Sequence, residues 1–312
     1  MAAGKGPADG HPRGRKGVLD LLAIGVTAVI WGTTWFAITL QLGVVDPIVS
    51  LVYRFGLSSA LLFAWCVLRG ERLALTAAQH RAVAGLGLFT FAIDYALTYW
   101  AEALVVSAVV AVLFASLAFV NLVVFRLLFG LREPRSAWIA TALGASGVAL
   151  ISWGELAEAR LDGRALVGLS LAFAAVLAAA FGNVFARHAE AAAAPLGVST
   201  AWSMAYGTAL LALFALVTGR PWAFDGRAPY VLSLLYLAVM GSVVAFLLYF
   251  TVARSRGYGT AGYILALTPL LAMAMSARFE GKSWSVMGFG GVTLVLVGQW
   301  LLLRTRPRGV DR

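Results

Sequence analysis

Charge, cysteine and histidine are all scarce in this chain of 312 residues. Charged residues make up 12% of the sequence, whereas a typical soluble domain carries about 25%. Cys66 is the single cysteine, which excludes an intrachain disulfide and a thiolate metal site. His11, His80 and His188 are scattered along the sequence, so no metal site is expected. The phosphate-binding pattern G-x-x-x-x-G-K-[ST] does not occur, and no nucleotide or other cofactor is expected.

Apolar residues, by contrast, make up 61% of the chain. A helix needs about 20 mostly apolar residues to cross the hydrocarbon core of a bilayer. The composition therefore leaves room for about ten crossings and for almost nothing else. It predicts an all-α integral membrane protein without a soluble domain.

Ten apolar runs are long enough to span a membrane. In the first half they are expected at residues 18–40, 47–68, 82–103, 105–129 and 137–153, and in the second half at 165–186, 198–218, 229–252, 260–277 and 285–303. Residues 1–17 are rich in Gly, Pro and basic residues and predict a disordered arm. Residues 154–164 are expected to form an outer connecting loop, and residues 304–312 a tail.

The basic residues indicate the orientation of the chain. The formal net charge is +10, but the Lys and Arg residues lie between the apolar runs and form no single stripe, so no nucleic-acid partner is expected. Most of the 24 Lys and Arg residues fall on the side of the N-terminus when the ten runs are threaded in order. Cytoplasmic loops carry the excess of basic residues in membrane proteins. Both termini are therefore predicted to face the cytoplasm.

The two halves of the sequence resemble each other at an offset of about 150 residues. Ile30–Phe36 aligns with Ala180–Ala186, and Glu133–Ser136 aligns with Glu280–Ser283. Each half, residues 18–153 and residues 165–303, contains an odd number of runs, so the second half must enter the membrane from the opposite face. The sequence predicts an inverted repeat, the usual construction of secondary transporters. Chance similarity between helices rich in Ala, Gly and Leu is the alternative explanation.

Several short motifs carry a resemblance to a known family. They are Trp31–Thr34, Tyr53–Phe55, Tyr99–Glu102, Ala111–Ser116, Gly130–Glu133, Leu267–Pro269 and Phe279–Gly281. Together they resemble the drug/metabolite transporter superfamily, in particular its EamA-type bacterial members. The resemblance covers residues 18–303 and implies ten transmembrane helices in two inverted five-helix repeats around a central cavity. It also implies export of amino acids or other small metabolites across the bacterial inner membrane.

Two charged residues fall well inside predicted spans. At a rise of about 1.5 Å per residue, Arg54 and Asp94 lie at similar depths, roughly 10 Å and 13 Å from the outer face. A charge in hydrocarbon costs at least a few kcal/mol, which makes each of them a functional candidate. As a desolvated ion pair they would fix the packing of two helices. Alternatively, Arg54 would anchor a substrate carboxylate, or Asp94 would act as a protonation switch.

Two further residues are candidates for conformational roles. Glu102 lies at the outer end of the third run, where it would be either an ordinary interfacial carboxylate or an outer gate. Pro269 is expected to break the ninth run at mid-membrane and to serve as a hinge.

Buried Tyr, Trp and Asn side chains need hydrogen-bond partners that lipid cannot supply, so those near mid-membrane are expected to face protein or a wet cavity. The predicted substrate-binding residues are Trp31, Thr34, Arg54, Asp94, Tyr95, Tyr99, Asn183, Tyr249 and Tyr263.

The sequence favours a secondary transporter that exports a small amphipathic solute by alternating access. The alternative is a membrane-embedded enzyme acting on lipid-linked substrates, for which no cluster of catalytic groups is found. The expected partners are a small-molecule substrate and the lipid bilayer. Proton coupling and a homodimer are left open by the sequence.

The repeat and the charge bias predict a definite labelling pattern. In a Cys66→Ala background, single cysteines at Gly4 and Gly309 are expected to react with a membrane-impermeant maleimide only after the cytoplasmic face is made accessible. A cysteine at Asp162 is expected to react from outside. Labelling of the two terminal positions from opposite faces would contradict both the orientation and the inverted repeat.

Overall fold

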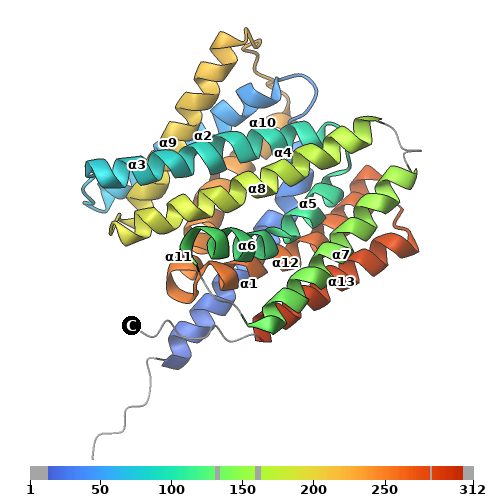
Figure 1. The fold of residues 1–312 in the computed structure, drawn as a ribbon. Helices are drawn as coiled ribbons and strands as arrows, with labels where there is room; N and C mark the ends of the chain where they lie inside the picture. Colours follow the sequence, from blue (N-terminus) through green and yellow to red (C-terminus); the bar gives the residue numbers. More distant parts are fainter. Residues whose placement is uncertain (1–12, 131–133, 159–162, 282, 305–312) are drawn as a thin grey trace, which may run out of the picture.

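The structure, a computed structural model, describes residues 13–130, 134–158, 163–281 and 283–304. In these four ranges the chain forms helices joined by short connections, without a strand (Figure 1). A helix satisfies its backbone N–H and C=O groups internally, which a chain in hydrocarbon must do because lipid offers no hydrogen-bond partner.

The first half (residues 13–158) contains five helical stretches, some of them built from several elements. Their bounds are α1 (Arg13–Thr39), α2 (Pro47–Leu68), α3 (Ala77–Leu86), η1 (Gly87–Asp94), α4 (Tyr95–Glu102), α5 (Ser107–Ala115), α6 (Leu117–Phe129) and α7 (Arg135–Glu158). The first stretch begins at Arg13, inside the segment expected to be an arm; residues 1–12 lie outside the described ranges. Lys and Arg are good helix formers, so the helix extends past the apolar run.

The second half (residues 163–304) also contains five stretches. Their bounds are α8 (Gly163–Ala191), α9 (Leu196–Val217), α10 (Ala228–Tyr236), η2 (Leu237–Val244), α11 (Ala245–Arg256), α12 (Tyr258–Met275), η3 (Ser276–Glu280) and α13 (Val286–Arg304). The connection between the halves is shorter than the expected loop, because α7 continues to Glu158 and α8 already begins at Gly163. The Glu, Leu and Ala residues of this segment favour helix.

Seven stretches among the described residues are long and apolar enough to cross a membrane. They begin at Leu19, Pro47, Ala77, Ser107, Gly163, Leu196 and Ala228. Two further apolar helices, Arg135–Ile151 and Val286–Gly298, are shorter. The prediction of an all-α integral membrane protein is confirmed, whereas the count of ten crossings stays a prediction.

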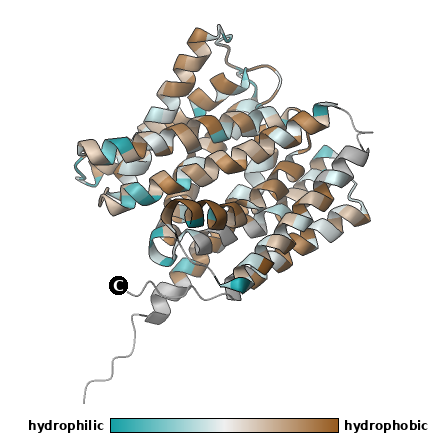
Figure 2. Cartoon of the chain, in the orientation of Figure 1, coloured by the Kyte–Doolittle hydropathy of each residue, from teal (hydrophilic) through white to brown (hydrophobic). Residues whose placement is uncertain are grey.

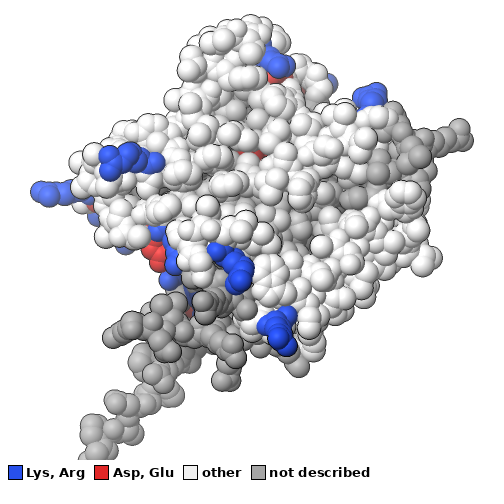
Figure 3. Space-filling model, in the orientation of Figure 1, with Lys and Arg blue, Asp and Glu red and all other residues white. Residues whose placement is uncertain are grey.

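The surface of the helices is apolar. Leu68, Val217 and Val286 expose 84%, 78% and 90% of their surface. Hydrophobic residues predominate along the helices in Figure 2, and the face drawn in Figure 3 shows only a few separate groups of Lys and Arg atoms. An extended apolar surface of this kind suits contact with lipid.

The two halves pack against each other in matching pairs. Helix α2 lies along α9, and α7 lies along α13, as Figure 1 shows for the second pair. Helix α1 packs against α11 and α12 of the second half, and α8 packs against α4 and α6 of the first. These contacts of one half therefore have counterparts in the other, as the sequence repeat predicts.

A π-helical segment occurs at the same place in each half. Both η1 and η2 have eight residues, and their first residues, Gly87 and Leu237, lie about 150 residues apart. Such segments are rare and are frequently found at functional sites. Close packing accompanies the first one, since a Cβ atom at Gly87 would lie 2.6 Å from the backbone oxygen of Ser203.

Two aromatic side chains make equivalent contacts across the halves. The Tyr53 hydroxyl on α2 donates to the carbonyl of Ala223, which follows α9, at 3.1 Å. The Trp202 indole N–H on α9 donates to the carbonyl of Leu73, which follows α2, at 2.9 Å. Each hydrogen bond joins a helix of one half to a loop of the other.

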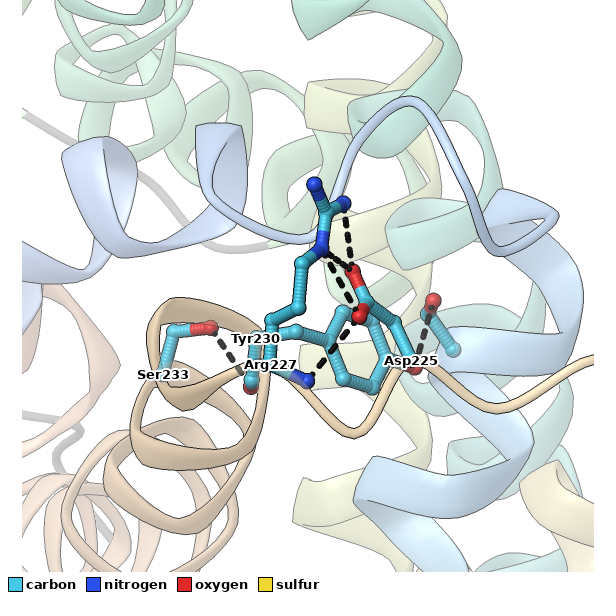
Figure 4. Close-up of polar contacts among 5 residues, drawn as sticks. Asp225, Arg227, Tyr230 and Ser233 are labelled. Atoms are coloured by element: carbon cyan, nitrogen blue, oxygen red, sulfur yellow. Dashed lines mark hydrogen bonds and ion pairs between the residues drawn. The ribbon is translucent and has the colours of Figure 1, made fainter.

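The loop before α10 is ordered by a local ion pair (Figure 4). The Asp225 carboxylate accepts hydrogen bonds from the backbone N–H of Arg227 at 3.0 Å and from its guanidinium Nη2 at 2.7 Å. These hydrogen bonds lower the pKa of the Asp225 carboxyl below its ordinary value. In the first turn of α10, the Tyr230 hydroxyl lies 3.0 Å from the Ser50 hydroxyl and thereby ties this helix to α2.

Helices α7 and α13 approach closely because glycine lies at their contact. A Cβ atom at Gly291 would lie 2.5 Å from Cγ1 of Ile151 and 2.7 Å from the backbone oxygen of Gly147. A Cβ atom at the neighbouring Gly290 would make only an ordinary contact, 3.6 Å from Leu150. Comparing alanine substitutions at Gly291 and Gly290 therefore distinguishes the effect of close packing from that of helix propensity.

Gly291→Ala is expected to destabilise the protein by about 1–3 kcal/mol, because the backbone facing it cannot move aside. Gly290→Ala is expected to be neutral or slightly stabilising, since alanine is the better helix former. Thermal unfolding of both variants in detergent measures the difference. Equal melting temperatures would contradict the close contact.

Candidate functional site

A cavity of about 70 Å³ lies between the two halves. Part of its wall is aromatic, contributed by α1, α4, α5 and α11. These side chains are Trp31, Trp35, Tyr95, Phe114, Phe246, Tyr249 and Phe250. A cavity of this volume has space for several water-sized groups. Both halves contribute to it, so a relative movement of the halves would change its shape.

The polar part of the wall is small. It consists of Thr34, Thr90, Asp94, Thr98 and Asn183. Asp94, the last residue of η1, is 5% exposed and accepts a hydrogen bond from the Thr98 hydroxyl at 3.3 Å. It is the only charged residue of the wall in the described part of the chain.

Trp31 is held in the wall by the second half. Its indole N–H donates to the carbonyl of Gly241 in η2 at 3.1 Å, and its ring centroid lies 5.3 Å from those of Phe246 and Tyr249. A Cβ atom at Gly241 would lie 2.8 Å from Cγ2 of Thr34, so glycine permits this approach. The ring therefore has a fixed position at the cavity.

A chain of hydrogen bonds fixes Tyr249 and Asn183 in the wall. The Tyr249 hydroxyl donates to Oδ1 of Asn183 at 3.1 Å, and Nδ2 of Asn183 donates to Oδ1 of Asn121 at 3.3 Å. This chain joins α11, α8 and α6. Asn183 therefore both lines the cavity and makes the interhelical hydrogen bond expected of a buried amide.

Arg54 does not line the cavity. It is 1% exposed, and its guanidinium donates from Nε to Ser242 Oγ at 3.0 Å and from Nη1 to the Tyr99 hydroxyl at 3.3 Å. Its Cζ atom lies 4.7 Å from the ring centroid of Tyr95, which does line the cavity. The arginine thus joins α2 to η2 and α4.

The proposed pairing of Arg54 with Asp94 is wrong for this structure. No ion pair of 4.0 Å or less joins the two residues, both of which the structure describes. The similar depths estimated from the helical rise do not fix the direction of the side chains. Arg54 points toward η2 of the second half, and Tyr99 is occupied by Arg54 and by Oε1 of Gln41, to which it donates at 2.9 Å.

Glu102 is not an exposed interfacial residue. It is 7% exposed, and neither of its carboxylate oxygens has a hydrogen-bond partner among the described residues. The nearby turn at the end of η3 is joined to α5 instead, because the Ser107 hydroxyl donates to the Glu280 carboxylate at 2.8 Å. The role of Glu102 as an outer gate stays a prediction.

The predicted residues Tyr263 and Pro269 both lie on α12. Pro269 is buried inside α12, and the helix continues through it, so the expected break is wrong; a hinge there stays a prediction. The α12 backbone at Tyr263 is described, but its side chain lies outside the described residues.

The structure thus brings together Trp31, Thr34, Asp94, Tyr95, Asn183 and Tyr249, and it leaves Arg54 and Tyr99 behind the wall. The sequence reasoning missed the remaining aromatic side chains and two threonines. Thr90 and Thr98 lie four residues before and after Asp94, a spacing that places them on one helix face and could have identified them. The phenylalanines of α11 carry no such signal, because a phenylalanine in an apolar run is as readily a lipid-facing residue.

Comparison with known proteins gives a match over both halves. The model of the EamA-like transporter family matches residues 19–153 and again residues 166–304. The matched segments are close to the two halves described above, and each contains five helical stretches.

Three curated proteins are similar along most of their length. The uncharacterized inner membrane transporter YedA of Escherichia coli strain K12 is 26% identical over 282 residues, which cover 88% of this chain and 89% of that protein. Protein PagO of Salmonella typhimurium is 23% identical over 303 residues, 94% of this chain and 95% of that protein. The uncharacterized transporter YvbV of Bacillus subtilis is 22% identical over 285 residues, 88% of both chains.

A solved crystal structure has the same fold. Its TM-score with this chain is 0.68 at 20% sequence identity, and the superposition covers 95% of this chain and 99% of the other.

Arg54→Ala is expected to lower the free energy of unfolding by about 2 kcal/mol or more. The variant loses a fully packed side chain and leaves Tyr99 and Ser242 without their donor. Arg69→Ala, which removes a side chain that is 60% exposed, serves as the control and is expected to change stability by less than about 0.5 kcal/mol. Thermal unfolding in detergent measures both, and equal effects would exclude a structural role for Arg54.

Proposed function

Because this chain belongs to the EamA-like transporter family, we propose that it exports small metabolites, amino acids or related amphipathic solutes, by alternating access between its two halves. A membrane transporter acts on small molecules within a lipid bilayer, and this coarser function follows from the family. The observation that supports the finer proposal is the cavity that both halves build around Asp94 and Asn183. In transporters made of repeats, the binding site lies at the junction of the halves.

The second half is proposed to cross the membrane in the sense opposite to the first, with both termini in the cytoplasm. The paired contacts of Tyr53 with Ala223 and of Trp202 with Leu73 support this proposal. Ala223 follows the second helix of its half, and Leu73 follows the second helix of the other. In an inverted arrangement these two loops lie on opposite faces of the membrane.

With this proposed orientation, ion pairs join the two halves on both the outer and the inner side of the cavity. Arg220, after α9, lies 3.3 Å from Asp46, the residue before α2. Arg256, at the end of α11, donates to Asp20 of α1 at 2.6 Å. Alternating access requires that each side separate while the other stays closed, so these contacts are the ones expected to break in turn.

A flux assay with cross-linked proteoliposomes tests the proposal. In a Cys66→Ala background, cysteine pairs at Tyr53 with Ala223 and at Leu73 with Trp202 are joined by a short bifunctional maleimide. Each cross-link is expected to reduce solute flux at least tenfold, because it holds one side closed. The measurement is the release of loaded amino acids and other labelled metabolites from the vesicles.

A pair within one half provides the control. Arg126 and Trp138 are neighbours on α6 and α7 of the first half, so a cross-link between cysteines at these positions is expected to leave flux unchanged. Full flux through both cross-linked inter-half pairs would exclude alternating access. Recovery of a chemically altered solute, and of no unmodified solute, would favour a membrane-embedded enzyme.

A further inference from the structure

The charged residues in and near the cavity limit the class of solute that it can bind. We propose that the cavity recognises the ammonium group of an amine, with the Asp94 carboxylate as its counter-ion, and that Arg54 does not bind a solute carboxylate. This inference rests on the proposed function only in taking the cavity as the solute site. It concerns which solutes bind there, and not how they cross the membrane.

The charge in the cavity wall has one sign. Asp94 is the one Asp, Glu, Lys, Arg or His among the described residues of the wall. Its Oδ1 atom accepts from Thr98, and its Oδ2 atom accepts no hydrogen bond from the described residues. A buried carboxylate with a vacant acceptor is satisfied by a cationic donor, whereas an anion beside it would be repelled.

The wall around Asp94 is also aromatic. The rings of Trp31, Tyr95 and Tyr249 lie around the same cavity as Asp94. Aromatic faces attract ammonium groups, and the attraction is larger where water is excluded. The hydroxyl of Tyr249 and the indole N–H of Trp31 are already bonded to protein, so these residues offer their rings to a solute and not their donors.

Arg54 is held outside the cavity wall. Its guanidinium is bonded to Ser242 and Tyr99 and lies against the ring of Tyr95, which lines the cavity, whereas Arg54 does not. A solute carboxylate could reach it only if Tyr95 left the wall and those hydrogen bonds broke. The described wall therefore presents no Lys or Arg to an anionic solute.

Three solutes with the same phenyl ring and similar length test the inference. Phenethylamine carries only the ammonium group, phenylalanine carries both charges, and phenylpropionate carries only the carboxylate. Calorimetric titration of the full-length protein in lipid nanodiscs is expected to show binding of phenethylamine, at least tenfold weaker binding of phenylalanine, and no binding of phenylpropionate. Binding of phenylpropionate as tight as that of the amine, or no binding of phenethylamine at millimolar concentration, would overturn the proposal.

Variants then place the ammonium group at Asp94. Asp94→Asn keeps the shape of the side chain and is expected to weaken phenethylamine binding at least tenfold. Glu190→Gln removes a carboxylate near the inner end of α8, away from the cavity, and is expected to leave affinity unchanged. Unaltered affinity in Asp94→Asn overturns the proposal. The three-solute comparison uses the unmodified protein, so the proposal can still be tested if the Asp94→Asn variant is unstable.

Measurements of solute binding and of solute flux distinguish the ammonium site from the proposed transport. Binding of the amine without any flux in proteoliposomes contradicts transport and leaves the ammonium site standing. Flux of unmodified phenylpropionate but not of phenethylamine contradicts the ammonium site and leaves transport standing.

Discussion

A polar group inside a bilayer has only the protein as a partner, because the hydrocarbon contains no water. The hydroxyls of Thr27, Ser203 and Thr268 accordingly donate to carbonyls of the preceding turn of their own helices. Side chains that reach further donate to the other half of the molecule instead. Trp31 and Tyr53 are examples, and Trp202 is their counterpart from the second half. Association of helices in lipid gains little from the hydrophobic effect, so such hydrogen bonds and close packing have to join the halves.

Two of the three π-helical segments in the described residues, η1 and η2, contribute polar contacts near the cavity. A π segment changes the direction of the backbone groups along a helix, and in η2 it brings the carbonyl of Gly241 to the indole of Trp31. Ser242, in the same segment, donates to the carbonyl of Leu237 and accepts from Arg54. In η1, the segment ends at Asp94 in the cavity wall. Each half therefore has a π segment that contributes polar contacts near the cavity.

Arg54 and Asp94 illustrate two ways of keeping a charge in a membrane protein. The arginine is surrounded by hydroxyl groups and aromatic rings and is used to hold helices together. The aspartate has one hydroxyl donor and faces a cavity. The arginine packs against Tyr95 and does not line the cavity, so the charge in the described part of the wall has one sign. A site of this kind selects its solute by charge as well as by size.

The sequence by itself determined the class of fold, because an apolar run of about 20 residues has few structures available to it other than a spanning helix. It predicted the bounds of α2 without error and those of the other stretches to within about five residues. It also identified Trp31, Asp94, Tyr95, Asn183 and Tyr249 as residues of one cavity, since buried polar groups are costly and therefore stand out in an apolar sequence. The tertiary structure alone decided which way each side chain points. Arg54 and Asp94 have similar depths along their helices, but rotation about a helix axis separates them, and sequence spacing between two different helices carries no information about that rotation.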